Sequence, residues 1–343
     1  VNSFKLTGPS NHIIRKLDSC LPTSSVDSSL LYIWTRVYEV AILEYGNLGI
    51  GDMKKLLITG ANGFLGWNIC RLAKDTWHLF GTVYSHQIEI PNVNTIKIDL
   101  TDHSELKGLF EEVRPDAVIH TAAASDPNFC QVNPDVSYGI NVEASVNIAL
   151  LCSDYMIPYV YTSTDLVFDG LKAPYRESDP VCPVNVYGEH KAQAEERILK
   201  AYPQSTVCRM SLMFGLSGPV TKSFIQPMLL AMKEGRELSL FVDEFRTPLS
   251  AEAAVVGLFL ALRKVHGIIH LGGKERISRY DFGKLMQRIF KFENAKIKPY
   301  KQDDIQMAAL RPADVSLDSS KAAELGFRPL PLFKELQNIY ESL

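Results

Sequence analysis

Three glycines, at positions 60, 63 and 66, constrain the fold of this chain more than any other feature. They lie in Gly60-Ala61-Asn62-Gly63-Phe64-Leu65-Gly66, between an apolar segment that predicts a strand and a segment that predicts a helix. The spacing is a variant of the dinucleotide-binding turn, where a side chain at each glycine would obstruct the turn, the pyrophosphate or helix packing. The helix N-terminus would bind the phosphates. A glycine-rich loop without a ligand is the alternative, and the strand–turn–helix context disfavours it.

The segments that follow alternate between short apolar runs and amphipathic stretches. This alternation predicts an α/β fold: a doubly wound parallel sheet of the Rossmann type, covered by helices on both faces. We expect strands at Lys55–Thr59, His78–Tyr84, Thr95–Ile98, Ala117–Thr121, Tyr159–Ser163, Ser205–Met210 and Gly267–Leu271. We expect helices at Trp67–Lys74, Glu105–Val113, Asn141–Ser153, Val186–Ala201, Phe224–Glu234, Ala251–Arg263 and Tyr280–Phe290.

The pattern loosens after Gly215, which predicts a smaller C-terminal α/β lobe. We expect residues 53–215, with 247–271 returning to them, to bind NAD(P), and residues 216–246 and 272–343 to form a substrate-binding lobe. Residues 1–52 lack the alternating pattern of the chain that follows, and their first part is rich in Ser, Pro and Asn. We expect Met53 to be the natural start and residues 1–52 to be an extension outside the core. The alternative is a real appendage that docks through Leu30–Leu48.

The end of the second expected strand bears on the choice of cofactor. NAD is commonly selected by an acidic residue there, but the sequence is Gly81-Thr82-Val83-Tyr84-Ser85-His86. Ser85 could hydrogen-bond a 2′-phosphate, so NADP(H) is slightly favoured over NAD(H), and no nearby arginine strengthens that preference. Asp99, beside Leu100 after the next strand, could accept a hydrogen bond from the adenine, or it could be a turn or N-cap carboxylate.

The pattern Tyr-x-x-x-Lys occurs twice, as Tyr187 with Lys191 and as Tyr280 with Lys284. This spacing places both side chains on one face of a helix. An ammonium beside a phenol is expected to lower the phenol pKa, so that the tyrosine can exchange a proton with a substrate oxygen. Only Tyr187 follows a strand-end hydroxyl, that of Thr164. We therefore expect Tyr187 and Lys191 to be catalytic and the later pair to be structural.

Several motifs together resemble the extended short-chain dehydrogenases/reductases, and within them the dTDP-4-dehydrorhamnose reductases. The resemblance covers about residues 53 to 343. Its motifs are Thr59–Gly66, Ala122-Ala123-Ala124, Asn141-Val142, Ser163–Gly170, Tyr187-Gly188-x-x-Lys191 and Arg311-Pro312-x-Asp314-Val315-x-Leu317-Asp318.

This resemblance implies NAD(P)H-dependent reduction of the C4 ketone of a nucleotide-linked 4-keto-6-deoxy sugar. By the same resemblance, Tyr187 would donate the proton, Lys191 would bind the cofactor ribose and Thr164 would polarise the ketone. Ala122, Ala123 and Asn141 would shape the cofactor side. An NAD-dependent nucleotide-sugar epimerase remains an alternative. So does a non-catalytic regulatory subunit, because the beta subunit of methionine adenosyltransferase also looks like this family. The likeness also suggests a homodimer.

Two positions depart from the reductase pattern. Leu166 and Leu212 stand where the family commonly has aromatic residues, which leaves open a sugar other than dehydrorhamnose. Leu166 also disfavours a 4,6-dehydratase, which needs an Asp-Glu pair where this chain has only Asp165.

Four charged residues are expected to contact the substrate: Asp126, Asp165, Arg246 and Arg311. The two arginines suit a diphosphate, although each could instead form a surface ion pair. Cys130 could line the cleft near Asp126 or be a small buried thiol. His266 and His270 read as strand residues, and no metal site is expected.

Composition excludes several other classes. The net charge of -3 gives no indication of a nucleic-acid or membrane partner, and no apolar run is long enough for a membrane helix or has the pattern of a signal peptide. The six cysteines are widely spaced without a Cys-x-x-Cys pair, which is typical of reduced thiols in a cytoplasmic protein. No motif of a serine hydrolase or a Walker-type kinase is present.

Overall fold

The centre of the protein is a parallel sheet of seven strands. The computed structural model describes residues 53–86 and 89–343, so the predictions about residues 1–52 lie outside the described residues. The strands are β1 (Lys55–Thr59), β2 (His78–Val83), β3 (Val93–Lys97), β4 (Ala117–His120), β5 (Tyr159–Thr164), β6 (Thr206–Met210) and β11 (Gly267–Leu271). Their order is β11-β6-β5-β4-β1-β2-β3, and every neighbouring pair is parallel. The predicted doubly wound α/β fold is confirmed.

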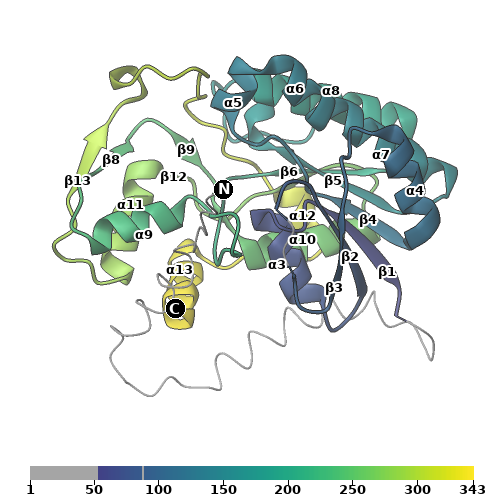
Figure 1. The fold of residues 1–343 in the computed structure, drawn as a ribbon. Helices are drawn as coiled ribbons and strands as arrows, with labels where there is room; N and C mark the ends of the chain where they lie inside the picture. Colours follow the sequence, from purple (N-terminus) through teal and green to yellow (C-terminus); the bar gives the residue numbers. More distant parts are fainter. Residues whose placement is uncertain (1–52, 87–88) are drawn as a thin grey trace, which may run out of the picture.

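Helices cover both faces of this sheet (Figure 1). One apolar core joins the sheet to α3, α10 and α12, and a second joins it to α4, α7 and α8. The inner strands are largely buried because helices cover both faces of the sheet; all six residues of β5 are buried, including the polar Thr162, Ser163 and Thr164. The helices around the sheet are α3 (Phe64–Ala73), α4 (His103–Val113), α5 (Pro127–Val132), α6 (Pro134–Tyr138), α7 (Ala144–Asp154), α8 (Val186–Ala201), α10 (Ala251–Lys264) and α12 (Ser320–Glu324).

A smaller lobe lies beside the carboxyl ends of the strands, at the left of Figure 1. It has its own apolar core, to which Phe214, Met228, Phe282, Met286 and Leu336 contribute. The parallel pair β8–β13 and the antiparallel pair β9–β12 belong to this region, while β7 pairs with β10. The bounds are β7 (Met213–Phe214), α9 (Ile225–Lys233), β8 (Leu238–Phe241), β9 (Phe245–Arg246), β10 (Leu249–Ser250), β12 (Ile277–Ser278), α11 (Arg279–Ile289), β13 (Ile297–Tyr300) and α13 (Leu332–Ser342).

Two helices begin at other residues than expected from the sequence, and short turns of other helix types are also present. Helix α3 begins at Phe64 rather than Trp67, since the glycine turn leads directly into it. The expected helix from Asn141 begins at Ala144, because a π-helical turn occupies Gly139–Glu143. Such turns interrupt helices mostly at functional sites. A 3-10 turn, Asp165–Val167, follows β5, and another lies at Gln302–Asp304.

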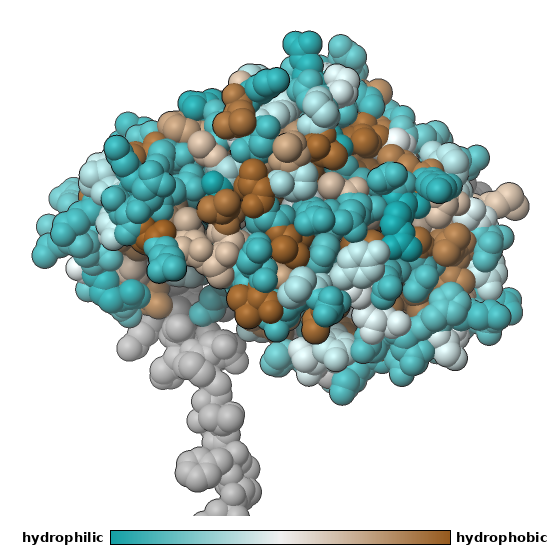
Figure 2. All heavy atoms as spheres, turned by 90° about the horizontal axis from the view of Figure 1, so that it is seen from above, coloured by the Kyte–Doolittle hydropathy of each residue, from teal (hydrophilic) through white to brown (hydrophobic). Residues whose placement is uncertain are grey.

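The strand order reverses between β1 and β4, which are neighbours in the sheet but far apart in sequence. Ligands of doubly wound folds bind at the carboxyl ends of strands beside such a reversal. The surface seen from above is mainly hydrophilic, with apolar side chains in small separate groups (Figure 2). In the described part of the chain, no helix is both long and apolar enough to cross a membrane.

Candidate active site

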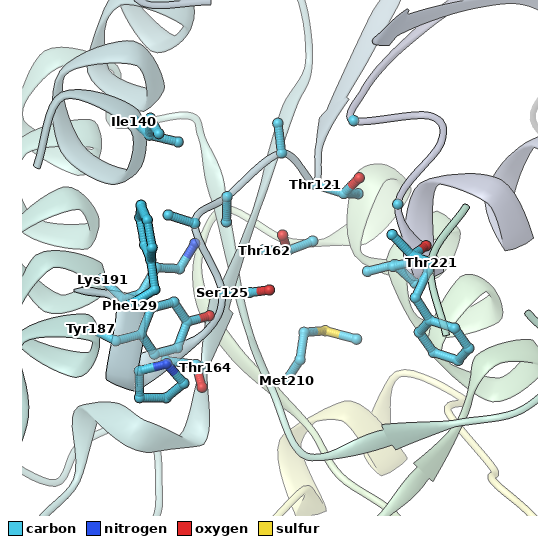
Figure 3. Close-up of a pocket in the computed structure, with 18 of the residues that line it drawn as sticks. Thr121, Ser125, Phe129, Ile140, Thr162, Thr164, Tyr187, Lys191, Met210 and Thr221 are labelled. Atoms are coloured by element: carbon cyan, nitrogen blue, oxygen red, sulfur yellow. The ribbon is translucent and has the colours of Figure 1, made fainter. Parts of the chain in front are cut away.

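A cavity of about 1490 Å³ lies between the sheet and the smaller lobe. It is lined by the residues after β1, β4 and β5, by α8, and by lobe segments around β8 and β9. Figure 3 shows Thr164, Tyr187 and Lys191 on one side of it and Thr221 on the opposite side. The sheet reversal therefore carries residues from distant parts of the sequence into one cleft.

The glycine turn fits a pyrophosphate because it has no room for side chains. Gly60 has a φ of +67°, and a Cβ there would lie 2.9 Å from the Cα of Ala122. A Cβ at Gly66 would lie 2.2 Å from the carbonyl oxygen of Gly60. Gly63, the N-cap of α3, has no side chain to cap the first N–H groups. Those groups and the positive end of the helix are therefore available to an anion.

Most of the residues expected to hold the cofactor line this cavity. They are Gly60, Asn62, Gly63, Phe64, Leu65, Gly66, Asp99, Leu100, Ala122 and Ala123. Ser85 lies outside the lining, exposed after β2, with its Oγ 2.8 Å from Nδ1 of His86. The Oδ1 of Asp99 accepts hydrogen bonds from the N–H and hydroxyl of Thr101, so this side chain also shapes a turn.

Asn141 does not line the cavity itself, but it holds the backbone of a loop that does. It is fully buried in the π-helical turn, and its Oδ1 accepts from the N–H of Ala124 while its Nδ2 donates to the carbonyl of Ala124. The side chain therefore fixes the loop after β4, which forms the cofactor side of the cleft. The contact is indirect: Asn141 holds the backbone that lines the cavity.

The three side chains expected to be catalytic line the same cavity, and Tyr187 and Lys191 share one face of a helix, as their spacing predicts. Tyr187 and Lys191 are one turn apart on the buried face of α8, and Thr164 ends β5; all three line the cavity (Figure 3). The Nζ of Lys191 lies 4.1 Å from the centre of the Tyr161 ring. The Oγ1 of Thr164 accepts a hydrogen bond from the N–H of Leu166. All three side chains are therefore accessible from one cavity.

Burial shifts the pKa values of Lys191 and Tyr187. It lowers the pKa of Lys191 to about 7, although Glu195 opposes the shift. Burial also raises the pKa of Tyr187, and the nearby Cys130 and Asp165 act in the same direction. The net shift in the pKa of Tyr187 is therefore upward, opposite to the direction expected from an adjacent ammonium.

A chain of buried charges closes the lobe side of the cavity. Nη1 of Arg246 donates to Oδ1 of Asp165 at 2.8 Å, and its Nη2 lies 3.4 Å from Glu244. Nε of Arg279 lies 3.9 Å from the same carboxylate of Glu244. Arg246 therefore forms a buried ion pair rather than the surface pair considered from the sequence. Burial raises the pKa of Asp165, while Arg246 acts against this shift.

Arg311 also lines the cavity, with Nη1 donating to the carbonyl of Ala309 and Nη2 3.4 Å from Oδ1 of Asn128. Asp126 is instead the N-cap of α5, where its Oδ1 accepts from the N–H of Asn128. Cys130 is buried against Leu166 and Tyr187 behind the cleft. Of the four predicted substrate contacts, Asp165, Arg246 and Arg311 thus line the cavity and Asp126 does not.

The remaining candidates lie elsewhere. Tyr280 and Lys284 are on α11, outside the cavity lining, and Lys284 donates to Gln287 at 2.7 Å. His270 is buried within β11, and His266 precedes that strand. Among residues 53–86 and 89–343, no three His, Cys, Asp or Glu side chains are grouped to hold a metal. The five described cysteines are free thiols.

Sequence reasoning missed Ser211, Glu244 and Arg279, which also line the cavity. Ser211 Oγ donates to Asp165 at 3.2 Å. Glu244 is two residues before Arg246, so its charge beside a candidate arginine was a usable signal. Arg279 had none, because only the packing of the lobe brings the start of α11 to the cleft. Leu166 and Leu212, noted for their missing aromatic rings, do line the cavity.

Comparisons with known proteins agree with the fold and the cavity described above. The chain is 30% identical over 276 residues to the probable low-salt glycan biosynthesis reductase Agl14 of Haloferax volcanii, covering 78% of this chain and 91% of that protein. It is 29% identical over 281 residues to methionine adenosyltransferase 2 subunit beta of Xenopus laevis, covering 80% and 83%.

Among solved structures, a hypothetical dTDP-4-dehydrorhamnose reductase from Sulfolobus tokodaii matches with a TM-score of 0.72 and 33% identity, over 81% of this chain and 98% of that one. The model of the RmlD substrate binding domain matches residues 53–343, which include every element of the sheet, the glycine turn and the smaller lobe. The chain therefore belongs to the RmlD substrate binding domain family.

Proposed function

We propose that this protein is an NAD(P)H-dependent reductase of a nucleotide-linked 4-keto-6-deoxy sugar, of the dTDP-4-dehydrorhamnose reductase type. One observation carries the proposal: Thr164, Tyr187 and Lys191 line the same cavity as the glycine turn. A dinucleotide on that turn would extend along the carboxyl ends of the strands toward these side chains. The similarity to a glycan biosynthesis reductase and to a reductase of dTDP-4-dehydrorhamnose supports the substrate class.

Each side chain has a role in this reaction. The nicotinamide, when bound, supplies the hydride. The hydroxyl of Thr164 donates a hydrogen bond to the ketone oxygen, and Tyr187 gives that oxygen its proton. The phenol of Tyr187, whose pKa burial raises, carries at neutral pH the proton that it donates. Lys191 binds the ribose hydroxyls of the cofactor.

The two parts of the chain bind different molecules. Residues 53–215 with 247–271 hold the cofactor, and residues 216–246 with 272–343 hold the sugar nucleotide. Arg311 and Arg246 bind the diphosphate, and Asp165 orients Arg246 through their ion pair. Asp126, which caps α5 and does not line the cavity, holds that helix beside the cleft. A guanidinium suits this role because it forms paired hydrogen bonds to phosphate oxygens.

The cofactor preference follows from the end of β2. Tyr84-Ser85-His86 presents no carboxylate to repel a 2′-phosphate, so NADPH is favoured slightly over NADH. We expect a homodimer that works in the cytoplasm, where free thiols such as those described here are stable.

The test is reduction of 4-keto-6-deoxy nucleotide-sugars, followed by cofactor absorbance with NADPH and NADH separately. Tyr187→Phe should lower kcat by about 10²- to 10⁴-fold, the usual contribution of a positioned acid. Its NADPH affinity should stay within about two-fold, or about 0.4 kcal/mol, because the hydroxyl acts on the ketone oxygen rather than on the cofactor. Unchanged turnover would refute the mechanism. Conversion of substrate without net cofactor consumption would indicate an epimerase.

A regulatory subunit is the second candidate, favoured by the 29% identity to methionine adenosyltransferase 2 subunit beta. Native pull-down distinguishes it from the first. A stoichiometric enzyme partner, together with no reduction of any 4-keto nucleotide-sugar, would support the regulatory role.

A further inference from the structure

Helix α8 carries a third buried polar side chain on the face of Tyr187 and Lys191. Glu195 lies one turn beyond Lys191, and its side chain is only 4% exposed. We propose that Glu195 is a positioning residue for the proposed reduction: it anchors the catalytic helix to the strand that carries Thr164, and it places a carboxylate one helical turn from Lys191, where the cofactor ribose would lie. The inference rests on the proposed function for the role of Lys191.

The anchoring follows from the partners of the carboxylate. Ser163, the residue before Thr164 on β5, donates its hydroxyl to Oε1 of Glu195. Arg209 on β6 donates to both carboxylate oxygens, with Nη2 at 2.7 Å from Oε2 and Nε at 3.1 Å from each. Arg209 in turn lies 3.4 Å from Nε2 of His270 on β11. One carboxylate thus ties α8 to β5 and β6, and through Arg209 to β11.

Stability alone is a weak reason for such a pair. Desolvation of two charges commonly offsets their attraction, and apolar residues of similar volume often serve a core as well or better. This pair stands beside a buried ammonium that is itself destabilised by desolvation. A carboxylate one turn away offsets that cost, and its hydrogen bonds from Arg209 and Ser163 hold it in place within the core.

The other titratable groups around Lys191 provide less support; of these, Cys130 also raises the pKa of Lys191, but less than Glu195 does. Tyr161 offers its ring face, Cys130 and Tyr187 are protonated at neutral pH, and His120 is neutral because burial and Lys191 lower its pKa to about 3. Glu195 is the largest influence that raises the pKa of Lys191. Asp165, next to Thr164, is already paired with Arg246.

The experiment titrates Lys191 directly in the ligand-free full chain, using ¹³C-labelled lysine and NMR, with the signal assigned by its loss in Lys191→Met. The unaltered protein should titrate near pH 7. In Glu195→Gln the midpoint should fall by about one pH unit, the low end of the effect of a close opposite charge. The matched control is Glu196→Gln, which removes an exposed carboxylate from the same helix and should leave the midpoint unchanged.

A second variant keeps the test valid if Glu195→Gln unfolds. Glu195→Leu/Arg209→Met removes both members of the pair, so it leaves no unpaired buried charge. Its Lys191 midpoint should also fall, and its NADPH affinity at neutral pH should weaken with it. An unchanged midpoint in the folded variants would overturn the proposal. Because the titration needs neither substrate nor turnover, this failure is distinct from the absence of reductase activity.

Discussion

Arg246 Nη1 lies 2.8 Å from Oδ1 of Asp165, and both side chains are buried. The pair joins β9 of the smaller lobe to the 3-10 turn after β5, directly beside Thr164. The smaller lobe is thus connected by charge to the residue that follows the proposed ketone-binding hydroxyl. The position of the lobe and the position of Thr164 are therefore coupled through this ion pair.

Removing one member of this pair should destabilise the protein strongly. Arg246→Met leaves the carboxylate of Asp165 buried without its main partner, so the free energy of unfolding should fall by about 3–5 kcal/mol. Arg176→Met is the matched control, because Arg176 is 73% exposed in its pair with Asp318, and exposed pairs contribute only about 0–1 kcal/mol. Denaturant unfolding measures both. Equal losses in the two variants would contradict the argument.

The glycine turn should not accept a methyl group. In Gly66→Ala the new Cβ would meet the Gly60 carbonyl at 2.2 Å, so we expect a loss of about 1–3 kcal/mol in the free energy of unfolding. NADPH affinity should also fall at least about tenfold, or 1.4 kcal/mol. At Gly108, an exposed position on α4, a Cβ would meet nothing within 4 Å. Gly108→Ala should instead raise the free energy of unfolding by about 0.5–1 kcal/mol. Normal NADPH binding by Gly66→Ala would argue against the phosphate site.

Ser85 provides a test of cofactor preference. Ser85→Asp places a carboxylate at the end of β2, where it would repel a 2′-phosphate, so NADPH affinity should fall at least about tenfold, or 1.4 kcal/mol. NADH affinity should change little. Ser85→Asn is the uncharged control of nearly the same shape. Fluorescence titration gives both dissociation constants, and an equal effect on the two cofactors would place Ser85 away from the 2′ position.

Glu335 predicts a pH dependence of stability. It is buried on α13, accepts a hydrogen bond from Ser250 at 3.0 Å, and burial raises its pKa from 4.5 to about 8. Between these values the folded state holds a proton that the unfolded state has lost. The free energy of unfolding should therefore decrease as pH rises toward 8, by at most about 1.4 kcal/mol per pH unit.

Glu335→Gln should remove this contribution, so that its stability declines less between pH 5 and about 8. Glu341→Gln, an exposed change on the same helix, should follow the unaltered protein. Thermal unfolding across this pH range makes the comparison. A parallel pH dependence in all three proteins would show that Glu335 does not titrate in this window.

Local spacing was sufficient for much of the fold and for part of the site. Strand and helix alternation predicted the doubly wound sheet, and the glycine turn and the Tyr187–Lys191 pair each lie within one element or one turn. Contacts of this kind depend on the 3.6-residue period of a helix or on the geometry of a single turn. The sequence therefore determined them without knowledge of the strand order.

Tertiary structure decided what joins distant elements. Asp165 and Arg246 are 81 residues apart, and Glu195, Arg209 and His270 meet only because β5, β6 and β11 are neighbours in the sheet. The same is true of the charges: burial, which no single segment specifies, lowers the pKa of Lys191 and raises that of Tyr187. A sequence gives the order of the ionisable groups, but their desolvation and their partners follow from packing.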